Sequence, residues 1–195
     1  MRELCQPGPA KRAIATWHPG SMLIAMAGLP ASGKSAVAAD LAGALNCAVL
    51  SVDPVEAAMW RAGISRAEPT GLAAYVVIGA LAAEQLVLGH DVIVDAVNGV
   101  EPARDLWRQL SASQGAELRF IYMQCSDEAE HRRRLAHRQR GIEAFPEPSW
   151  ASVQRRRDEF PPWTDERLIL DAMNSRAGNL RAALEYLGRP ANRPR

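Results

Sequence analysis

Residues 28–35 carry the clearest chemical signal in the sequence. They read Gly-Leu-Pro-Ala-Ser-Gly-Lys-Ser and match the phosphate-binding pattern GxxxxGK[ST] at every position. The apolar run Met22–Ala27 comes directly before them, and an alanine-rich stretch of helical character follows. Glycines permit a tight loop whose backbone N–H groups point inward and form a nest for an anion. The pattern and its flanks predict a P-loop that holds the phosphates of a nucleoside triphosphate.

Lys34 and Ser35 indicate what such a loop can hold. In loops of this kind the lysine ammonium bridges the β- and γ-phosphates, and the next hydroxyl reaches a Mg²⁺ ion. The N-terminus of the following helix adds partial positive charge. A chance glycine-rich turn is the alternative interpretation. We expect ATP and Mg²⁺ to bind, with contacts from Gly28, Pro30, Ala31, Ser32, Gly33, Lys34, Ser35 and Ala36.

Residues that are missing narrow the class of P-loop protein. Translation-type GTPases read guanine with an Asn/Thr-Lys-x-Asp motif, and the sequence has no lysine beyond Lys34. Motor-type and ring-forming ATPases carry a glutamate directly after the aspartate of the third strand, whereas Asp95 is followed by Ala96. A small phosphotransferase remains, in which the substrate supplies the attacking hydroxyl and a lid excludes water.

A phosphotransferase needs one carboxylate beside the γ-phosphate and a second one for the metal. Asp53 is the candidate base, because it ends the second predicted strand at the carboxyl edge of the sheet, where such folds bind ligands. An N-cap before Pro54 is a compatible alternative for Asp53. Asp95 ends the third strand, and we expect it to join Ser35 in the metal site through a coordinated water. A structural hydrogen bond at a strand end is the alternative for Asp95.

Arginines can neutralise the charge of a transferred phosphoryl group. Arg134 and Arg138 are four residues apart, share a helix face and lead into the breaker-rich loop 141–148. We expect at least one of them to act from a lid over about 134–150; a solvated basic face is the alternative. The arginine run 155–157 is interpreted as solvated. Arg104 is either a substrate or phosphate contact or half of a surface ion pair.

Other polar and aromatic residues are weaker candidates. Asn98 and Glu101 follow Asp95 and could face the acceptor. For the tryptophans, core packing is the preferred interpretation and an acceptor pocket the alternative; these are Trp60, Trp107, Trp150 and Trp163. No role is assigned to His90, His131 or His137.

Apolar strands alternate with helical stretches along the chain. Strands are expected over 22–27, 48–52, 91–95, 118–124 and 168–170, and helices over 33–45, 55–62, 72–88, 101–113, 127–139, 150–159 and 175–187. The alternation and the motif predict one α/β domain of the P-loop NTPase fold. It has a five-stranded parallel sheet, helices on both faces and a small helical lid. The domain spans 21–187, between a flexible N-terminal tail, 1–20, and a C-terminal tail, 188–195.

Composition limits the partners and the location. The formal net charge is +1, which gives no electrostatic case for nucleic acid or a membrane surface. No uninterrupted apolar run is long enough to span a membrane, and no signal-peptide core precedes Ser21. Three widely spaced cysteines without a CxxC pair are typical of a reducing cytoplasm. We expect a cytoplasmic protein with a small-molecule partner, and the oligomeric state stays open.

Four stretches resemble one group of P-loop kinases: GLPASGKS, LSVDPVEAAMW, VIVDAVN and CSDEAEHRRRLAHR. The group includes zeta toxins, polynucleotide 5′-kinases and chloramphenicol phosphotransferase, and the similarity runs from about residue 22 to 187. The second and third stretches are particularly similar to chloramphenicol phosphotransferase, where the matching carboxylate acts as base. The resemblance implies Asp53 as base, Lys34 and Ser35 on phosphate and metal, and Arg134 or Arg138 in the lid.

Two departures from the group narrow the expected substrate. Glu56 stands where polynucleotide kinases have an arginine three residues after the base. Zeta toxins carry a larger substrate-binding insert than this chain accommodates. We expect ATP-dependent phosphorylation of a hydroxyl on a small molecule, such as an antibiotic, nucleoside or sugar. Two alternatives stay open: an ATP-binding regulator or ATPase without an acceptor, and a zeta-toxin-like nucleotide-sugar kinase.

Overall fold

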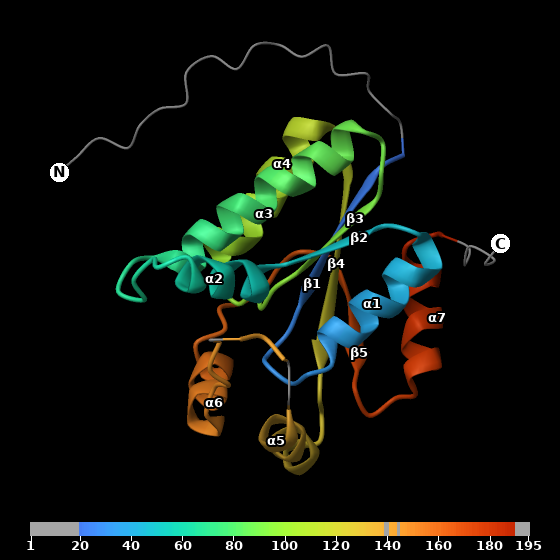
Figure 1. Ribbon diagram of the computed structural model, residues 1–195. Coiled ribbons are helices and arrows are strands. Elements are labelled where there is room, and N and C mark those ends of the chain that lie inside the picture. Colours follow the sequence, from blue (N-terminus) through green and yellow to red (C-terminus); the bar gives the residue numbers. More distant parts are fainter. Residues whose placement is uncertain (1–19, 139–140, 144, 190–195) are drawn as a thin grey trace.

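A computed structural model describes residues 20–138, 141–143 and 145–189. Five parallel strands form one sheet in the order β2-β3-β1-β4-β5 (Figure 1). The strands are β1 (Met22–Ala27), β2 (Ala48–Ser51), β3 (Val92–Asp95), β4 (Glu117–Gln124) and β5 (Arg167–Asp171). The helices are α1 (Lys34–Leu45), α2 (Val52–Arg61), α3 (Thr70–Val87), α4 (Glu101–Gln114), α5 (Glu128–His137), α6 (Trp150–Asp158) and α7 (Arg176–Tyr186). The predicted α/β fold is confirmed; most of both predicted tails, 1–19 and 190–195, lies outside the described residues.

Strand β1 occupies the centre of the sheet, and all its residues are buried. It pairs in parallel with β3 and β4, which puts Met26 opposite Asp95 and Ala27 opposite Tyr122. The carboxyl ends of β1, β2 and β3 therefore meet at one edge. The P-loop, Asp53 and Asp95 lie at or just beyond these strand ends, at the edge where open α/β sheets bind ligands.

The side chains of β1 alternate between two hydrophobic cores, as expected for a strand covered on both faces. Ile24 packs in the core that α1 and α7 complete, and Leu23 packs in the core that α3 and α4 complete. Trp107 of α4 is fully buried in the second core, and Trp163 packs against it. Core packing, the preferred interpretation of these two tryptophans, matches their positions.

Helix α3 is long and apolar enough to cross a membrane if length and composition alone are considered. Its 18-residue window has a mean hydropathy of 1.5, and 33% of that window is buried. The buried side includes Ala74, Ile78, Ala82 and Leu86, which pack in the same core as Leu23 and Trp107. A core helix of an α/β domain meets the same criteria, so this single helix is weak evidence for a membrane span.

Helices α5 and α6 form a small unit beside the P-loop (Figure 1). A third core joins Leu29 of the P-loop to Leu135 of α5 and Val153 of α6, with Trp150 packed against it. The predicted lid, 134–150, covers only the end of α5, the segment that joins the two helices and the first residue of α6. Residues 139, 140 and 144 of this range lie outside the described part of the chain. The structure thus attaches this unit directly to the phosphate-binding loop; that it closes over a substrate stays a prediction.

Candidate active site

The P-loop between β1 and α1 depends on the backbone freedom of Gly28. Its φ angle is +141°, and a Cβ atom added there would lie 2.3 Å from the Met123 carbonyl oxygen. The Gly28 N–H donates a hydrogen bond of 3.2 Å to the Val97 carbonyl. Only glycine permits both this conformation and this close approach. The first glycine of the motif therefore allows the loop to pack directly against β4 and the segment after β3.

The loop ends at a helix start suited to an anion. Gly33, with φ +95°, precedes α1, and the first turn of α1 contains no acidic residue to offset its partial positive charge. The buried Ser32 hydroxyl has no hydrogen-bond partner among the described residues. Because an unpartnered buried hydroxyl is costly, a ligand oxygen is a suitable missing partner. These features fit a phosphate group.

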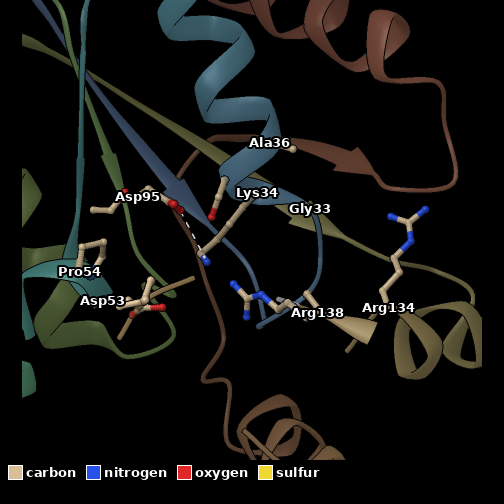
Figure 2. Close-up of a pocket in the computed structure, with 12 residues that line it drawn as sticks. Gly33, Lys34, Ala36, Asp53, Pro54, Asp95, Arg134 and Arg138 are labelled. Atoms are coloured by element: carbon tan, nitrogen blue, oxygen red, sulfur yellow. Dashed lines mark ion pairs between the residues drawn. The ribbon is translucent and has the colours of Figure 1, made fainter. Parts of the chain in front are cut away.

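Lys34 and Asp95 form a buried ion pair. Lys34 Nζ lies 3.6 Å from Asp95 Oδ1, and each side chain is 6% exposed. Figure 2 shows the two side chains pointing toward each other from α1 and β3. Asp95 arrives there because β1 and β3 pair in register, so the end of β3 lies beside the start of the P-loop. The ammonium group therefore already has a counter-charge in this arrangement.

A pocket of about 510 Å³ opens over the P-loop, and we call it the first pocket. It combines the helix start of α1 with two carboxylates and two arginines (Figure 2). Its lining residues are Ala31, Gly33, Lys34, Ser35, Ala36, Ser51, Asp53, Pro54, Asp95, Arg134, Arg138 and Ile142. The structure thus brings together Lys34, Ser35, Asp53, Asp95, Arg134 and Arg138, all of which the sequence singled out.

Asp53 lies on α2 rather than at the end of a strand. Strand β2 ends at Ser51, which is also the N-cap of α2, so Asp53 stands in the first turn of the helix. The expected strand end at residue 52 and the N-cap alternative for Asp53 therefore differ from the structure. The difference arises because Pro54 is compatible with a first helical turn, and a carboxylate there is favoured by the helix dipole. Asp53 still faces the first pocket.

A second pocket of about 420 Å³ lies on the other side of Asp53. It shares Lys34, Asp53 and Arg138 with the first pocket. Its remaining lining comes from the P-loop, from the loop after β3, from α2, α3 and α6, and from the segment that joins α5 to α6: Pro30, Val52, Glu56, Trp60, Gly71, Tyr75, Val97, Phe145, Pro146, Glu147, Pro148, Ser152 and Arg156. Two adjoining chambers therefore meet at one carboxylate, one ammonium group and one guanidinium group.

The two candidate arginines occupy different positions. Arg134 on α5 donates to Glu130 Oε1 at 2.7 Å and to the Ala172 carbonyl at 3.1 Å, and it lines the first pocket only. Arg138 follows α5, lies 3.6 Å from a carboxylate oxygen of Glu147 and lines both pockets. In Figure 2, Arg138 extends toward Lys34 and Asp53, whereas Arg134 lies farther away beside α5. Arg138 is thus the one nearer the junction of the pockets.

His131, to which the sequence assigned no role, contacts the P-loop directly. It is 4% exposed, and its Nε2 lies 2.8 Å from the Pro30 carbonyl oxygen. Because a carbonyl only accepts hydrogen bonds, Nε2 carries the proton and donates. The ring also packs edge-on against Trp150 of α6, with centroids 5.3 Å apart. No sequence motif marks this residue, since its partner is a backbone atom.

Several weaker candidates have structural partners instead of a place in either pocket. Asn98 is fully buried, donates to the Met26 carbonyl at 2.7 Å and accepts from Trp107 Nε1 at 2.8 Å. Arg104 is also fully buried and pairs with Glu101 at 2.5 Å.

Two residues for which the sequence favoured a structural or solvated position line the second pocket instead: Trp60 and Arg156. Arg156 thus differs from the expectation of a purely solvated run.

The metal site expected at Ser35 and Asp95 is chemically reasonable. Both residues line the first pocket, and Asp95 Oδ1 is a buried oxygen without a hydrogen-bond partner in the described part of the chain. Among those residues there is no cluster of three or more His, Cys, Asp or Glu side chains. Mg²⁺ commonly takes only one or two protein oxygens and fills its shell with phosphates and water. The donor set therefore fits Mg²⁺ bound together with a nucleotide.

Comparison with known proteins supports this picture. A family model described as AAA domain matches residues 23–160. None of the curated proteins matches the chain. A gluconokinase structure from Sinorhizobium meliloti 1021 is 21% identical with a TM-score of 0.61, and the match covers 88% of this chain and 93% of the gluconokinase.

Two further solved structures contain nucleotides. The Mycobacterium tuberculosis APS kinase CysC, solved with AMPPNP and APS, is 19% identical with a TM-score of 0.64, over 86% of this chain and 98% of CysC. Chaetomium thermophilum Kti12, solved with ADP-AlF3, is 16% identical with a TM-score of 0.66, over 87% of this chain and 100% of Kti12. At these identities the likeness establishes a shared P-loop fold.

Proposed function

The chain belongs to the family described as AAA domain, and from this premise we propose that it is an ATP-dependent phosphotransferase acting on a hydroxyl of a small molecule. ATP occupies the first pocket and the acceptor occupies the second. The observation that carries the proposal is the position of Asp53, which lines both pockets beside Lys34. A carboxylate at such a junction can meet the acceptor hydroxyl and the γ-phosphate together.

The P-loop holds the triphosphate by its backbone N–H groups and the N-terminus of α1. Lys34 turns from Asp95 toward the β- and γ-phosphates, a short movement because its ammonium already lies at the edge of the first pocket. Ser35 and Asp95 would hold Mg²⁺, the latter through a water molecule. When bound, Mg²⁺ neutralises charge on the phosphate oxygens.

The transfer step uses Asp53 and Arg138. The acceptor hydroxyl oxygen forms a bond to the γ-phosphorus as the bond from that phosphorus to the β-γ bridging oxygen breaks, and ADP leaves. The hydroxyl proton passes to the Asp53 carboxylate. Arg138, which lines both pockets, neutralises the charge on the phosphoryl oxygens between donor and acceptor. Arg134 contacts the nucleotide from the α5 side of the first pocket.

The second pocket favours a kinase over a nucleotide-binding regulator or an ATPase without an acceptor. A regulator needs the first pocket only, whereas the chain also has a chamber of about 420 Å³ beside the Asp53 carboxylate. That volume suits a small molecule better than a macromolecule. A cytoplasmic location, where ATP and small metabolites are abundant, is part of the same proposal.

A screen of ADP release tests the proposal. The full-length protein is incubated with ATP and Mg²⁺, alone and with sugars, nucleosides, hydroxylated antibiotics and nucleotide sugars. The expected result is acceptor-stimulated ADP release that is lost in Lys34→Ala. Stimulation by nucleotide sugars alone would favour the toxin-like alternative. Tight ATP binding without stimulation by any acceptor would contradict the proposal and favour the regulator.

A further inference from the structure

Helix α2 presents three chemically distinct side chains to the second pocket. Asp53, Glu56 and Trp60 stand at spacings of three and four residues, which puts them on one helix face about one turn apart. The order along this face runs from a carboxylate beside Lys34, through a second carboxylate, to an aromatic ring. An acceptor that meets Asp53 therefore extends along Glu56 toward Trp60.

Glu56 and Trp60 are held in place by one buried hydroxyl. Trp60 Nε1 donates to Thr70 Oγ1 at 2.9 Å, and Thr70 Oγ1 donates to Glu56 Oε1 at 2.9 Å. Thr70 is only 4% exposed. The chain of hydrogen bonds polarises and orients both groups that line the pocket. Such second-layer support is typical of side chains that must present a fixed geometry to a ligand.

The Glu56 carboxylate keeps capacity for further hydrogen bonds. No lysine or arginine in the described ranges forms an ion pair with it, and its one hydrogen bond there is to Thr70. A carboxylate accepts about four hydrogen bonds and donates none. It is half-buried at the wall of the pocket, so a ligand must bring donors to replace the water that it displaces.

The far end of the pocket offers an apolar wall. The Trp60 ring stacks on Phe145, with centroids 5.2 Å apart and an interplanar angle of 19°, and the Arg66 guanidinium lies over the ring, 4.6 Å from its centroid. The edge of the Trp60 ring therefore forms the wall together with Phe145, Pro146 and Pro148. Across from α2, the Tyr75 hydroxyl accepts from the Asn98 N–H at 3.2 Å and retains a proton to donate. Burial raises the pKa of Tyr75 to about 12, so this hydroxyl stays protonated at neutral pH.

We propose that the acceptor is a polyhydroxylated compound, a sugar or polyol, rather than a simple alcohol. One hydroxyl meets Asp53 and is phosphorylated, a neighbouring hydroxyl donates to Glu56, and the C–H groups of the carbon skeleton pack against the edge of Trp60 and the apolar side chains beside it. Carboxylates accept hydrogen bonds from hydroxyl groups, and apolar side chains cover C–H groups, so the order of side chains along α2 suits a ligand that carries both. This inference rests on the proposed function.

Steady-state kinetics at saturating ATP test the inference. The probes are glucose, gluconate and ribitol, compared with benzyl alcohol and serine, which carry one hydroxyl each. The variants are Glu56→Gln, Trp60→Ala and Trp60→Phe, with Glu68→Gln as the control because Glu68 is exposed and lines neither pocket. Binding is measured separately by isothermal titration calorimetry with ADP present, where no transfer occurs.

We expect at least one polyol to be phosphorylated. Glu56→Gln should raise its KM about tenfold, the size expected for one hydrogen bond to a charged group, and Trp60→Ala should do the same while Trp60→Phe recovers part of the loss. The KM for ATP and the polyol kinetics of Glu68→Gln should stay unchanged. A loss in Glu56→Gln of about a thousandfold or more would instead indicate an acceptor ammonium group and overturn the proposal.

The failures can be told apart. If only the single-hydroxyl probes are phosphorylated, the polyol inference is wrong and the kinase assignment stands. The same holds if Glu56→Gln and Trp60→Ala leave both the polyol KM and the calorimetric binding titration unchanged. If no probe stimulates ADP release, although ATP binds and the protein melts cooperatively, both the kinase assignment and the inference that rests on it are wrong.

Discussion

The Lys34 ammonium nitrogen lies 3.6 Å from Asp95 Oδ1, and both side chains are 6% exposed. The lysine of the P-loop therefore has a buried counter-charge on the neighbouring strand. Removal of either partner leaves the other charge buried and uncompensated, which is more damaging than removal of both. Under the proposed function, the pair would link the stability of the free protein to its capacity to bind phosphate.

Substitution Lys34→Met should separate these two roles. The variant should lose ATP binding and about 3 kcal/mol of unfolding free energy, because Asp95 is left without its counter-charge. The double variant Lys34→Met/Asp95→Asn should recover most of the stability but none of the ATP binding. Urea unfolding and nucleotide titration measure the two effects. Arg176→Met is the control, because its pair with Asp40 is exposed and should be worth less than about 1 kcal/mol. Equal stabilities of the single and double variants would contradict the coupling.

Gly28 and Gly43 form a matched pair of glycine positions. Gly28→Ala should unfold the P-loop locally and abolish ATP binding, because the new Cβ would lie 2.3 Å from the Met123 carbonyl at φ +141°. Gly43→Ala adds a Cβ with no atom within 4 Å on an exposed turn of α1, so it should stabilise the protein by about 0.5–1 kcal/mol. Isothermal titration with ATP and thermal melting check both. ATP binding by Gly28→Ala at wild-type affinity would contradict the close packing of the loop.

The fold was largely predictable because the signals for it are local. The apolar run at β1, the glycine motif and the alternation of strands with helices define the parallel sheet, and all five strands lie within about two residues of their expected bounds. The start of α2 was not predictable to the residue, because Ser51, Asp53 and Pro54 each suit a helix start. The strand order required long-range pairing that no sequence window contains.

His131→Phe should weaken nucleotide binding although His131 contacts the P-loop backbone and lines neither pocket. The substitution removes the donor to the Pro30 carbonyl, so the P-loop loses a buried hydrogen bond that joins it to α5. We expect the KM for ATP to rise about tenfold with a smaller change in kcat, and His131→Gln, which can still donate, to recover part of the loss. His90→Phe is the control, since His90 is exposed and bonds only to Gln85 among the described residues. Similar kinetics for His131→Phe and His90→Phe would exclude a positioning role.

The Asp165 carboxylate should make stability depend on pH in the acid range. Hydrogen bonds from Arg108 hold the pKa of Asp165 below its ordinary value of 3.8. A lowered folded-state pKa gives stabilisation that is present above about pH 4 and lost as the pH falls through that lower value. Asp165→Asn should therefore lower the unfolding free energy by roughly 1–2 kcal/mol at pH 7, and the difference from wild type should shrink toward pH 2. Urea unfolding at both pH values measures this. A stability difference between Asp165→Asn and wild type that stays constant with pH would contradict this role of Asp165. Glu166→Gln is the control, because the Glu166 side chain is 83% exposed.

The candidate site was predictable in part. Lys34, Ser35, Asp53 and Asp95 could be identified because each ends a strand or comes soon after one at the expected ligand-binding edge, and the structure gathers them in the first pocket. For Trp60 an acceptor pocket was only the less favoured alternative, and the place of Glu56 and Trp60 in a second chamber became evident only once α2 was known to face it. His131 carries no sequence signal, since its partner is the backbone of Pro30, 101 residues away in the chain. Arg104 takes the ion-pair alternative, with Glu101, but it is buried and not at the surface, and Asn98 is buried as well. Neither burial could be inferred from charge or polarity alone.

Mass spectrometry of the acceptor, after incubation with ATP, Mg²⁺ and either wild-type protein or Asp53→Asn, tests the role of Asp53 in phosphoryl transfer. We expect the wild-type protein to add one phosphoryl group to the acceptor. Asp53→Asn should do so at least about 100-fold more slowly, while its ATP affinity changes less than about threefold, because Asp53 acts on the acceptor proton and not on nucleotide binding. Phosphorylation by Asp53→Asn at the wild-type rate, or ATP consumption by the wild-type protein without any phosphorylated acceptor, would contradict the account.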